Sequence, residues 1–264
     1  MDSAHPSQSS GTVSSLRGVA FPSRPLVVIP TYNERDNVPR LLPEILESDG
    51  RIHILIVDDA SPDHTAEAVR GLVEQYPLRL FLESRPRKLG LGSAYVNGFK
   101  WGLTRGYDFL IEMDGDWSHH PRYLATMIGL SREADFVIGS RYLPGGGTLN
   151  WGAGRKLLSR YATVYSNWIL GTRFTDITGG FNGWAGRVLE KLGLDTLRSD
   201  GYSFQIELKY KALRSGYRYL EMPILFDERR TGRSKMSVSI ALEAAWRVWQ
   251  FRLGNQRGSR RTPD

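Results

Sequence analysis

Residues 107–116 read YDFLIEMDGD, an apolar run that stops at two carboxylates separated by one glycine. A short apolar run bounded by turn-forming residues is typical of a buried strand. A similar run occurs upstream, where residues 52–59 read IHILIVDD, and residues 26–30, LVVIP, form another that ends at a proline. We therefore predict three buried strands, two of which end in a pair of acidic residues.

The segments between these runs predict helices, so strands and helices alternate along the first half of the chain. Helices are expected at residues 34–46, 62–76 and 93–104 and after residue 121, and further strands at residues 78–82 and 135–138. This alternation predicts an α/β fold with a mostly parallel central sheet and helices on both faces. Sheets of this type bind ligands at the carboxyl ends of their strands.

The pattern changes after Ser140. Helices are expected at residues 155–170, 204–214 and 237–253, and one strand at residues 217–226. We expect this half to complete the same domain, because it lacks an alternating pattern of its own.

The composition is close to that of an ordinary globular protein, with 41% hydrophobic and 24% charged residues. The absence of cysteine excludes a disulfide scaffold, thiolate catalysis and cysteine zinc sites. A net charge of +7 favours phosphate-bearing partners, namely nucleic acid, an anionic membrane surface or a sugar nucleotide. No stretch approaches the roughly 18 apolar residues of a membrane span, and the first residues lack the features of a secretory signal.

The acidic pairs Asp58-Asp59 and Asp114-x-Asp116 are the strongest functional signal. Two carboxylates one residue apart can hold a divalent ion, which can clamp a diphosphate. Acidic side chains beside a nucleoside can also accept hydrogen bonds from ring N–H groups or ribose hydroxyls. The alternative is that these aspartates only cap the helices that follow the strands.

Motifs in a fixed order along residues 25–250 resemble those of the polyprenyl-phosphate (dolichyl-phosphate) mannosyltransferases, a branch of glycosyltransferase family 2. The first half carries VIPTYNE (28–34), IVDDASPD (56–63), KLGLGSA (88–94), MDGDWSH (113–119) and IGSRY (138–142). The second half matches through Arg155-x-x-x-Ser159, Asp176-x-Thr178-x-Gly180-Phe181 and Arg229-x-x-Gly232-x-Ser234-Lys235. The resemblance implies a GT-A-type nucleotide-sugar-binding fold. It also implies transfer of mannose from GDP-mannose to a polyprenyl monophosphate, with inversion.

The domain organisation that follows has four parts. We expect residues 1–24 to form a disordered leader and residues 25–235 the GT-A catalytic domain. Residues 236–253 would form an amphipathic C-terminal helix, and residues 254–264 a basic disordered tail.

The resemblance assigns the donor side of the site. Nucleotide-sugar binding is implied for Pro30, Tyr32, Glu34, Asp58, Asp59, Gly92 and Asp114. The implied ligands of Mg²⁺ or Mn²⁺ are Asp114, Asp116 and Ser118, the last standing where the family often has glutamine. Asp116 would also be catalytic. His119 and His120 are expected to be loop residues.

Basic residues of the second half are expected to bind the acceptor. Arg155 and Ser159 are four residues apart and share one helix face, so a guanidinium and a hydroxyl can grip a phosphate together. The resemblance adds Arg141 and Arg229 to the acceptor-phosphate site, and implies catalytic roles for Arg141, Arg229 and Lys235. A polyprenyl phosphate is already anionic, so no general base is required.

The last helix predicts a membrane contact. Leu242, Trp246, Trp249 and Leu253 are spaced four, three and four residues apart along one face, as in an interfacial helix. Such a helix can instead dock on the protein's own core. The apolar residues of segment 151–168 are a second candidate surface for the isoprenoid. We expect peripheral attachment at the cytoplasmic face of a membrane, with no transmembrane segment.

The sequence leaves three alternative functions to consider. The enzyme could be a UDP-glucose-dependent polyprenyl-phosphate glucosyltransferase or another family 2 transferase, which the motifs do not resolve. The basic charge would also suit a nucleic-acid-binding protein. However, the carboxylates at the strand ends would repel a phosphate backbone, and no nucleic acid partner is expected. A noncatalytic relative is disfavoured by the intact acidic and basic motifs.

Overall fold

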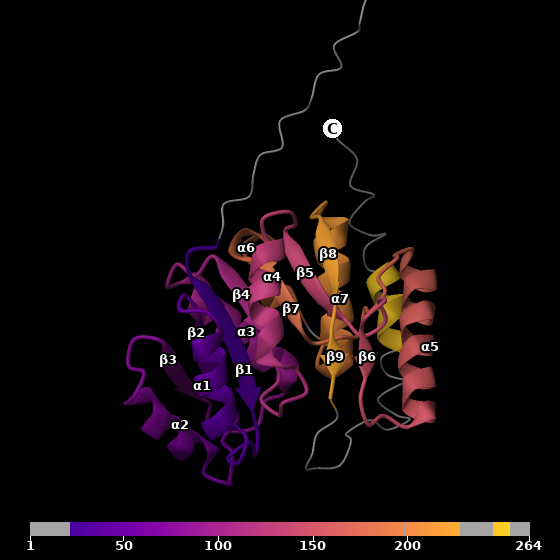
Figure 1. The fold of residues 1–264 in the computed structure, drawn as a ribbon. Coiled ribbons are helices and arrows are strands. Elements are labelled where there is room, and N and C mark those ends of the chain that lie inside the picture. Colours follow the sequence, from indigo (N-terminus) through magenta and orange to yellow (C-terminus); the bar gives the residue numbers. More distant parts are fainter. Residues whose placement is uncertain (1–21, 198, 228–244, 254–264) are drawn as a thin grey trace, which may run out of the picture.

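The computed structural model describes residues 22–197, 199–227 and 245–253 (Figure 1). Seven strands form one sheet in the order β3-β2-β1-β4-β7-β5-β8, and β6 pairs with β9 in a small second sheet. The strands are β1 (Pro25–Thr31), β2 (His53–Asp58), β3 (Leu80–Ser84), β4 (Phe109–Glu112), β5 (Phe136–Ser140), β6 (Gly147–Thr148), β7 (Asn182–Ala185), β8 (Tyr219–Pro223) and β9 (Leu225–Phe226). This mostly parallel α/β architecture confirms the predicted fold class.

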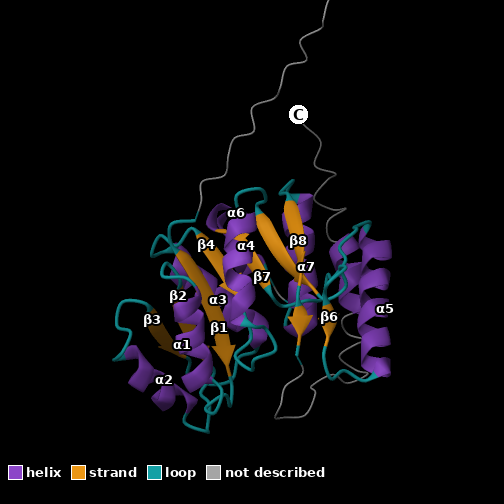
Figure 2. Ribbon diagram, in the orientation of Figure 1, coloured by secondary structure: helices purple, strands orange, loops and turns teal. Residues whose placement is uncertain are grey.

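The helices alternate with the strands in the first half of the chain (Figure 2). They are α1 (Val38–Ser48), α2 (Thr65–Val73), α3 (Leu91–Leu103), α4 (Leu124–Leu130), α5 (Ala153–Leu170), α6 (Gly186–Leu192) and α7 (Gly201–Arg214), with 3-10 turns η1 (Pro121–Tyr123) and η2 (Leu194–Thr196). Residues 245–253 are also helical. No helix in the described ranges is long and apolar enough to cross a membrane.

Strand side chains alternate between two cores, one on each face of the sheet. In β1, Val27 and Ile29 join a cluster with α1, α2 and α4, while Leu26 and Val28 join a cluster with α3, α6 and α7. This period of two is expected when both faces of a strand are buried. The helices therefore cover both faces, as predicted.

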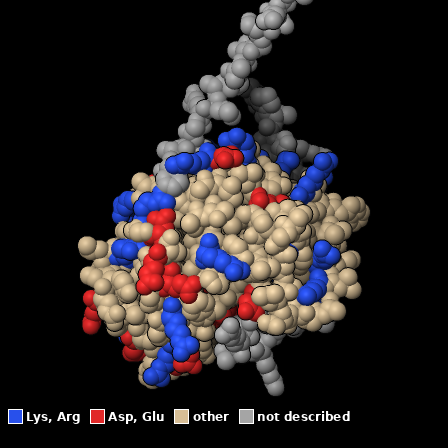
Figure 3. Space-filling view, in the orientation of Figure 1, with Lys and Arg blue, Asp and Glu red and all other residues tan. Residues whose placement is uncertain are grey.

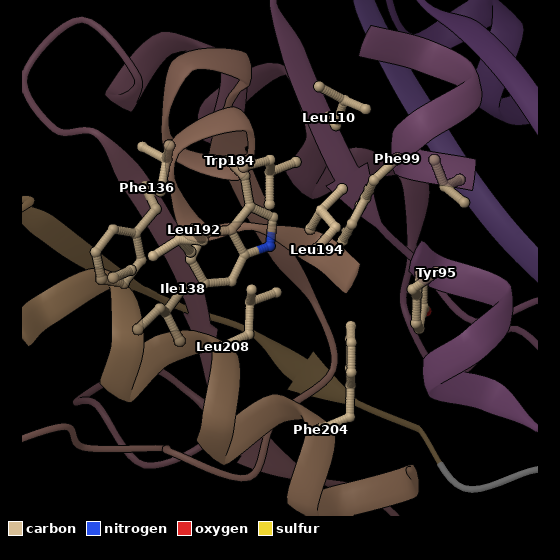
Figure 4. Packing of buried hydrophobic residues seen from close by; sticks show 14 of the residues in the cluster. Tyr95, Phe99, Leu110, Phe136, Ile138, Trp184, Leu192, Leu194, Phe204 and Leu208 are labelled. Carbon is tan, nitrogen blue, oxygen red and sulfur yellow. The ribbon is translucent and has the colours of Figure 1, made fainter. Parts of the chain in front are cut away.

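Strand β7 was not predicted from the sequence. It runs antiparallel between β4 and β5, and its Trp184 ring stacks on Phe136 with centroids 4.8 Å apart. Figure 4 shows this indole among Leu192, Leu194 and Leu208 in the core. The segment NGWA contains no apolar run. A glycine is needed at position 183, because a Cβ there would strike the Phe109 ring. The strand is therefore recognisable only from its tertiary packing.

Helix α5 lies at the end of the molecule opposite α2 (Figure 1). On the face drawn in Figure 3, most visible acidic side chains lie over the half that contains α1 and α2. The half that contains α5 shows mainly uncharged atoms and isolated basic groups. On this face the two halves therefore differ in how many acidic side chains are visible.

Candidate active site

The carboxyl ends of β1, β2 and β4 bring the predicted donor-binding segments together. Thr31 pairs with Asp58 across β1 and β2, and the Met113 amide donates to the Val28 carbonyl at 3.2 Å. Gly115 lies against this edge, because a Cβ there would be 3.3 Å from Ile29 Cγ2 and 3.7 Å from Glu34 Cγ. The Asp114-Gly115-Asp116 loop is thus packed beside the segment that contains Tyr32 and Glu34.

Asp58 is buried and organises the turns around it. Its carboxylate accepts hydrogen bonds from Thr31 Oγ1 (2.9 Å), Ser61 Oγ (2.6 Å) and the Ser61 amide (3.0 Å). These three donors fix the ends of β1 and β2 relative to each other. These contacts fit the alternative in which Asp58 caps the turn that follows β2. Contact of Asp58 with a nucleoside stays a prediction.

Asp59 forms a buried ion pair with Arg85, which lies just beyond β3. The other Asp59 oxygen accepts from the amides of Leu89 (3.1 Å) and Gly90 (3.2 Å). Arg85 also donates to Ser93 Oγ (2.7 Å). Arg85 was not predicted as a functional residue, because a single arginine after a strand belongs to no recognisable motif. The pair fixes the 88–92 loop, which contains Gly92 of the predicted nucleotide-sugar site.

Tyr32 and Glu34 lie in the segment that follows β1. The ammonium of Lys88 lies 3.7 Å from the centroid of the Tyr32 ring, a cation–π contact that joins the β1 turn to the 88–92 loop. Glu34 is buried and accepts from Asn37 Nδ2 at 2.7 Å. Pro30, near the end of β1, is half-buried.

Gly92 connects the donor loop to the second half of the chain. Its amide donates to Asp200 Oδ1 at 2.6 Å, and the same oxygen accepts from the Gly201 amide at 2.8 Å. One carboxylate therefore caps the N-terminal ends of both α3 and α7. A Cβ on Gly92 would be 2.7 Å from the Ser199 carbonyl oxygen, so this close approach requires glycine.

The acidic loop is held in an unusual backbone conformation. Trp117 has a φ of +67°, in the left-handed region that bulky residues rarely adopt. The Ser118 amide donates to Asp116 Oδ1 at 3.1 Å, and Ser118 Oγ lies 3.5 Å from Asp114 Oδ2. The three predicted metal-binding residues thus meet in one tight turn.

His119 supports the loop that contains Asp114 and Asp116. Its Nδ1 accepts a hydrogen bond from the Asp114 amide at 3.1 Å, and its ring packs 5.0 Å from Phe181 and 5.3 Å from Phe226. Burial lowers the pKa of His119 to about 4, so the ring is neutral near pH 7. His119 was expected to be a loop residue, and in the structure it lies in the loop after β4 and supports the Asp114 backbone.

The side-chain oxygens of this turn are suitable ligands for a hard divalent cation. Mg²⁺ and Mn²⁺ prefer oxygen ligands, and Mg²⁺ is commonly held by one or two carboxylates together with substrate phosphates. Asp114, Asp116 and Ser118 supply two carboxylates and a hydroxyl. Within the described residues, no group of three or more acidic, histidine or cysteine side chains is positioned for a metal. A cation here would therefore depend on phosphate oxygens of the donor for part of its shell.

Arg141, at the end of β5, is buried and paired with Asp176. Its Nε and Nη2 donate to the two carboxylate oxygens at 2.6 and 2.7 Å, and Nη2 also donates to Thr178 Oγ1 at 3.0 Å. Burial alone would raise the pKa of Asp176, but the adjacent guanidinium outweighs it and holds the pKa below its usual value. The Asp176 and Thr178 of the family motif thus serve to hold Arg141.

A buried network braces the segment that contains Asp176. Lys209 of α7 donates to the backbone carbonyls of Asp176 (3.3 Å), Ile177 (3.1 Å) and Gly179 (2.7 Å). The sequence pattern did not reveal this role, because Lys209 lies within a helix that otherwise indicates core packing. We infer that Lys209 keeps the Arg141 partner in place.

The remaining predicted acceptor residues are only partly placed. Arg155 and Ser159 lie on α5, where Ser159 is buried and the Arg155 guanidinium lies 4.0 Å from the centroid of the Trp151 ring. Arg229 and Lys235 lie outside the described residues. Their roles stay predictions.

Comparison with known proteins gives matches over most of the chain. The model of the family described as "Glycosyl transferase family 2" matches residues 26–192. Polyprenol monophosphomannose synthase of Mycolicibacterium smegmatis is 44% identical, over 89% of this chain and 91% of that protein. Undecaprenyl-phosphate mannosyltransferase of Micrococcus luteus is 42% identical, over 87% and 94%.

Solved structures share the fold. Glucosyl-3-phosphoglycerate synthase of Mycobacterium tuberculosis, in complex with Mn²⁺, UDP and phosphoglyceric acid, superposes with a TM-score of 0.63 at 15% identity. That match covers 92% of this chain and 80% of the other. A mannosyltransferase of Pyrobaculum calidifontis in complex with GDP-Man and Mn²⁺ gives 0.53 at 19% identity, over 91% and 76%. The GT-A-type architecture expected from the motifs is confirmed.

Proposed function

Because the chain belongs to glycosyl transferase family 2, we propose that it transfers mannose from GDP-mannose to a polyprenyl monophosphate. The observation that carries the proposal is that the Phe226 ring lies close both to the buried Arg141 and to His119, which holds the acidic loop. The centroid of that ring lies 5.3 Å from that of His119 and 5.6 Å from Arg141 Cζ. The loop that carries the predicted diphosphate-binding carboxylates and a predicted phosphate-binding cation therefore lie near one another.

The acceptor determines the chemistry. An oxygen of the polyprenyl phosphate attacks the anomeric carbon of mannose, and a new C–O bond forms. The bond from that carbon to the donor diphosphate breaks, and its electron pair leaves with GDP. Since the attacking oxygen is already anionic, no side chain has to remove a proton. Attack opposite the leaving group inverts the configuration and gives a β-linked mannosyl phosphate.

The acceptor phosphate and the donor diphosphate repel each other, and the basic side chains of the protein would reduce this repulsion. Arg141 is rigidly oriented by Asp176, so its charge needs little reorganisation when phosphate charge accumulates. Arg155, Arg229 and Lys235 would add positive charge on the acceptor side. Asp114 and Asp116, with Ser118, would hold Mg²⁺ or Mn²⁺, which when bound supplies charge that neutralises the leaving diphosphate.

The donor is proposed to be GDP-mannose rather than UDP-glucose. Two relatives with more than 40% identity are named polyprenol monophosphomannose synthase and undecaprenyl-phosphate mannosyltransferase. The solved structure in complex with UDP described above is only 15% identical and supports the fold alone. The nucleoside would occupy the pocket of Pro30, Tyr32 and Glu34, above the loops fixed by Asp58 and Asp59.

Peripheral membrane binding completes the proposal, since a polyprenyl tail leaves lipid at a cost of about 0.8 kcal/mol per CH₂. Two surfaces support it. The exposed fractions of Leu157, Tyr161, Val164 and Trp168 along one face of α5 are 64–76%. On the last helix, Trp246 (63%), Trp249 (40%) and Leu253 (55%) are exposed as well.

The last helix has one side that docks on the protein and one exposed side, and its contact with a membrane is part of the proposal. Val248 is buried, and Trp249 Nε1 donates to Tyr165 Oη of α5 at 3.1 Å, so one side docks on the protein. Trp246 remains on the outward side. Leu242, the first residue of the predicted stripe, lies outside the described residues. The exposed apolar side chains of this helix and of α5 are of the kind that suits a bilayer interface.

A product assay tests the proposal. The purified protein is incubated with radiolabelled GDP-mannose or UDP-glucose, polyprenyl phosphate in vesicles, and Mg²⁺ or Mn²⁺. The proposal predicts label in the lipid extract from GDP-mannose and little from UDP-glucose. Preferential glucose transfer would establish the alternative donor. Binding to oligonucleotides without turnover of either donor would point to the nucleic-acid-binding alternative.

A further inference from the structure

We propose that Tyr142 and Trp151 bind the acceptor phosphate directly through their buried polar atoms, while their rings align the arginines around it. The inference rests on the proposed function and extends its acceptor site by two aromatic residues. Tyr142 follows Arg141 at the end of β5, and Trp151 lies just before α5.

Aromatic rings surround the Arg141 guanidinium on several sides. Its Cζ lies 5.2 Å from the centroid of Trp151, 5.4 Å from that of Tyr142 and 5.6 Å from that of Phe226. Contacts of this length are cation–π interactions, which strengthen when the cation is removed from water. The cage therefore limits how Arg141 can move and which direction remains open to a ligand.

Two of these rings also contact a second arginine. Arg155 Cζ lies 4.0 Å from the Trp151 centroid, and Arg160 Cζ lies 5.4 Å from the Tyr142 centroid. Trp151 thus brings Arg141 and Arg155 to one indole despite their like charge. Such an arrangement is favourable when an anion lies between or beside the guanidiniums, because phosphate oxygens accept from several N–H donors at once.

The polar atoms of the Tyr142 and Trp151 rings indicate an anion-binding site beside Arg141. The Tyr142 hydroxyl and the Trp151 indole nitrogen are buried, and neither has a hydrogen-bond partner among the described residues. The Trp151 side chain belongs to a residue that is only 8% exposed. A buried donor without a partner is costly, so such groups in a folded protein commonly indicate a ligand or an ordered water.

The lipid-linked phosphate fits this place better than a small free anion. The segment that contains Trp151 leads directly into α5, whose Leu157 and Tyr161 are exposed. A phosphate monoester with an apolar tail could place its head among the arginines and its tail along that helix. The proposed ligand class is therefore a prenyl phosphate, held by two guanidiniums, an indole N–H and a phenol O–H.

Conservative variants separate this role from a structural one. Trp151→Phe keeps a ring beside both arginines and removes the N–H, and Tyr142→Phe removes only the hydroxyl. Matched controls are Trp101→Phe and Tyr107→Phe, whose rings stack on each other 5.9 Å apart away from the acceptor segment. Initial rates are measured with a water-soluble short-chain prenyl phosphate, so that membrane binding does not influence the result.

The proposal predicts that each site variant raises KM for the prenyl phosphate about tenfold or more, as expected for a lost hydrogen bond to a charged group. The KM for GDP-mannose and the melting temperature should stay near the wild-type values, and the controls should leave the acceptor KM unchanged. An unchanged acceptor KM in both site variants would overturn it, as would equal increases in the two KM values. If the wild type itself transfers no mannose, the proposed function fails rather than this assignment.

Discussion

Arg141 and Asp176 form a bidentate ion pair in which both side chains are almost completely buried, with N–O distances of 2.6 and 2.7 Å. The pair joins the end of β5 to the segment that precedes β7. Because the carboxylate is held by Arg141 and the adjoining backbone by Lys209, the arginine has one orientation. A fixed cation of this kind is suited to stabilising charge that develops on a transferred phosphate.

Asp176→Asn should therefore destabilise the fold and reduce turnover together. It leaves the Arg141 charge buried without a counter-ion, which costs about 3–5 kcal/mol. Urea denaturation measures the loss. The control is Asp195→Asn, which breaks an exposed pair with Lys100 expected to contribute less than about 1 kcal/mol. Equal, small effects of the two substitutions would contradict the structural importance of the buried pair.

Asp116→Ala should remove metal-dependent activity. Loss of a carboxylate that holds the cation should cost about 3 kcal/mol of transition-state stabilisation or more, a rate decrease of roughly 100-fold. EDTA should abolish wild-type activity, and added Mg²⁺ or Mn²⁺ should restore it. Full activity of the variant, or of the wild type in excess EDTA, would refute a metal site at Asp114 and Asp116.

Arg85→Met should weaken donor binding selectively. Arg85 is the buried partner of Asp59, and the pair fixes the loop that carries Gly90 and Gly92. We expect KM for GDP-mannose to rise while KM for the acceptor changes little. Arg79→Met is the matched control, since Arg79 donates to backbone carbonyls at the opposite end of β3. A uniform loss of stability with unchanged donor KM would indicate that the Arg85 pair is only structural.

The buried Lys209 should make the free energy of unfolding depend on pH. Burial lowers its pKa from 10.5 to about 8. A group whose pKa is lower in the folded state stabilises the fold above its unfolded pKa, and this contribution declines as pH falls through the folded pKa. The free energy of unfolding of the wild type, relative to Lys209→Met, should therefore increase from pH 8 to pH 10 by roughly 2 kcal/mol. Denaturant titrations at the two pH values measure it, and a constant difference would contradict the prediction.

Membrane attachment should require both aromatic surfaces. Replacing Trp246 and Trp249 by serine should weaken liposome flotation, and adding Tyr161→Ser and Trp168→Ser should abolish it, because exposed aromatic side chains anchor at the lipid interface. Leu78→Ser is the control, as Leu78 is 79% exposed but lies far along the chain from these helices. If the fourfold variant is folded by circular dichroism and still floats like the wild type, another surface must bind lipid.

Much of the fold could be predicted because buried strands leave a local signal. The runs ending at Pro30, Asp58 and Asp114 combine an apolar segment with a sharp polar stop, and each is a strand in the structure. Strand β7 could not be found this way, because Gly183 is required only by the Phe109 ring from another strand. The information lies in a tertiary contact and not in the local pattern.

The candidate site, too, could be predicted only in part from the sequence. The motifs located Asp114, Asp116 and Arg141, which carry charge at strand ends. They did not indicate that Asp59 is paired with Arg85, or that Arg141 is enclosed by aromatic rings. These partners come from distant segments and have residue types that occur throughout any protein. Only their spatial arrangement reveals the role.

The most direct test of the account compares two acceptors that differ only in the phosphate. Wild-type protein is given labelled GDP-mannose and a divalent cation with either a polyprenyl phosphate or the corresponding free polyprenol. If the attacking oxygen belongs to an anionic phosphate and no general base is present, label should enter lipid only with the phosphate. Comparable transfer to the free alcohol, or release of free mannose without lipid product, would contradict the account.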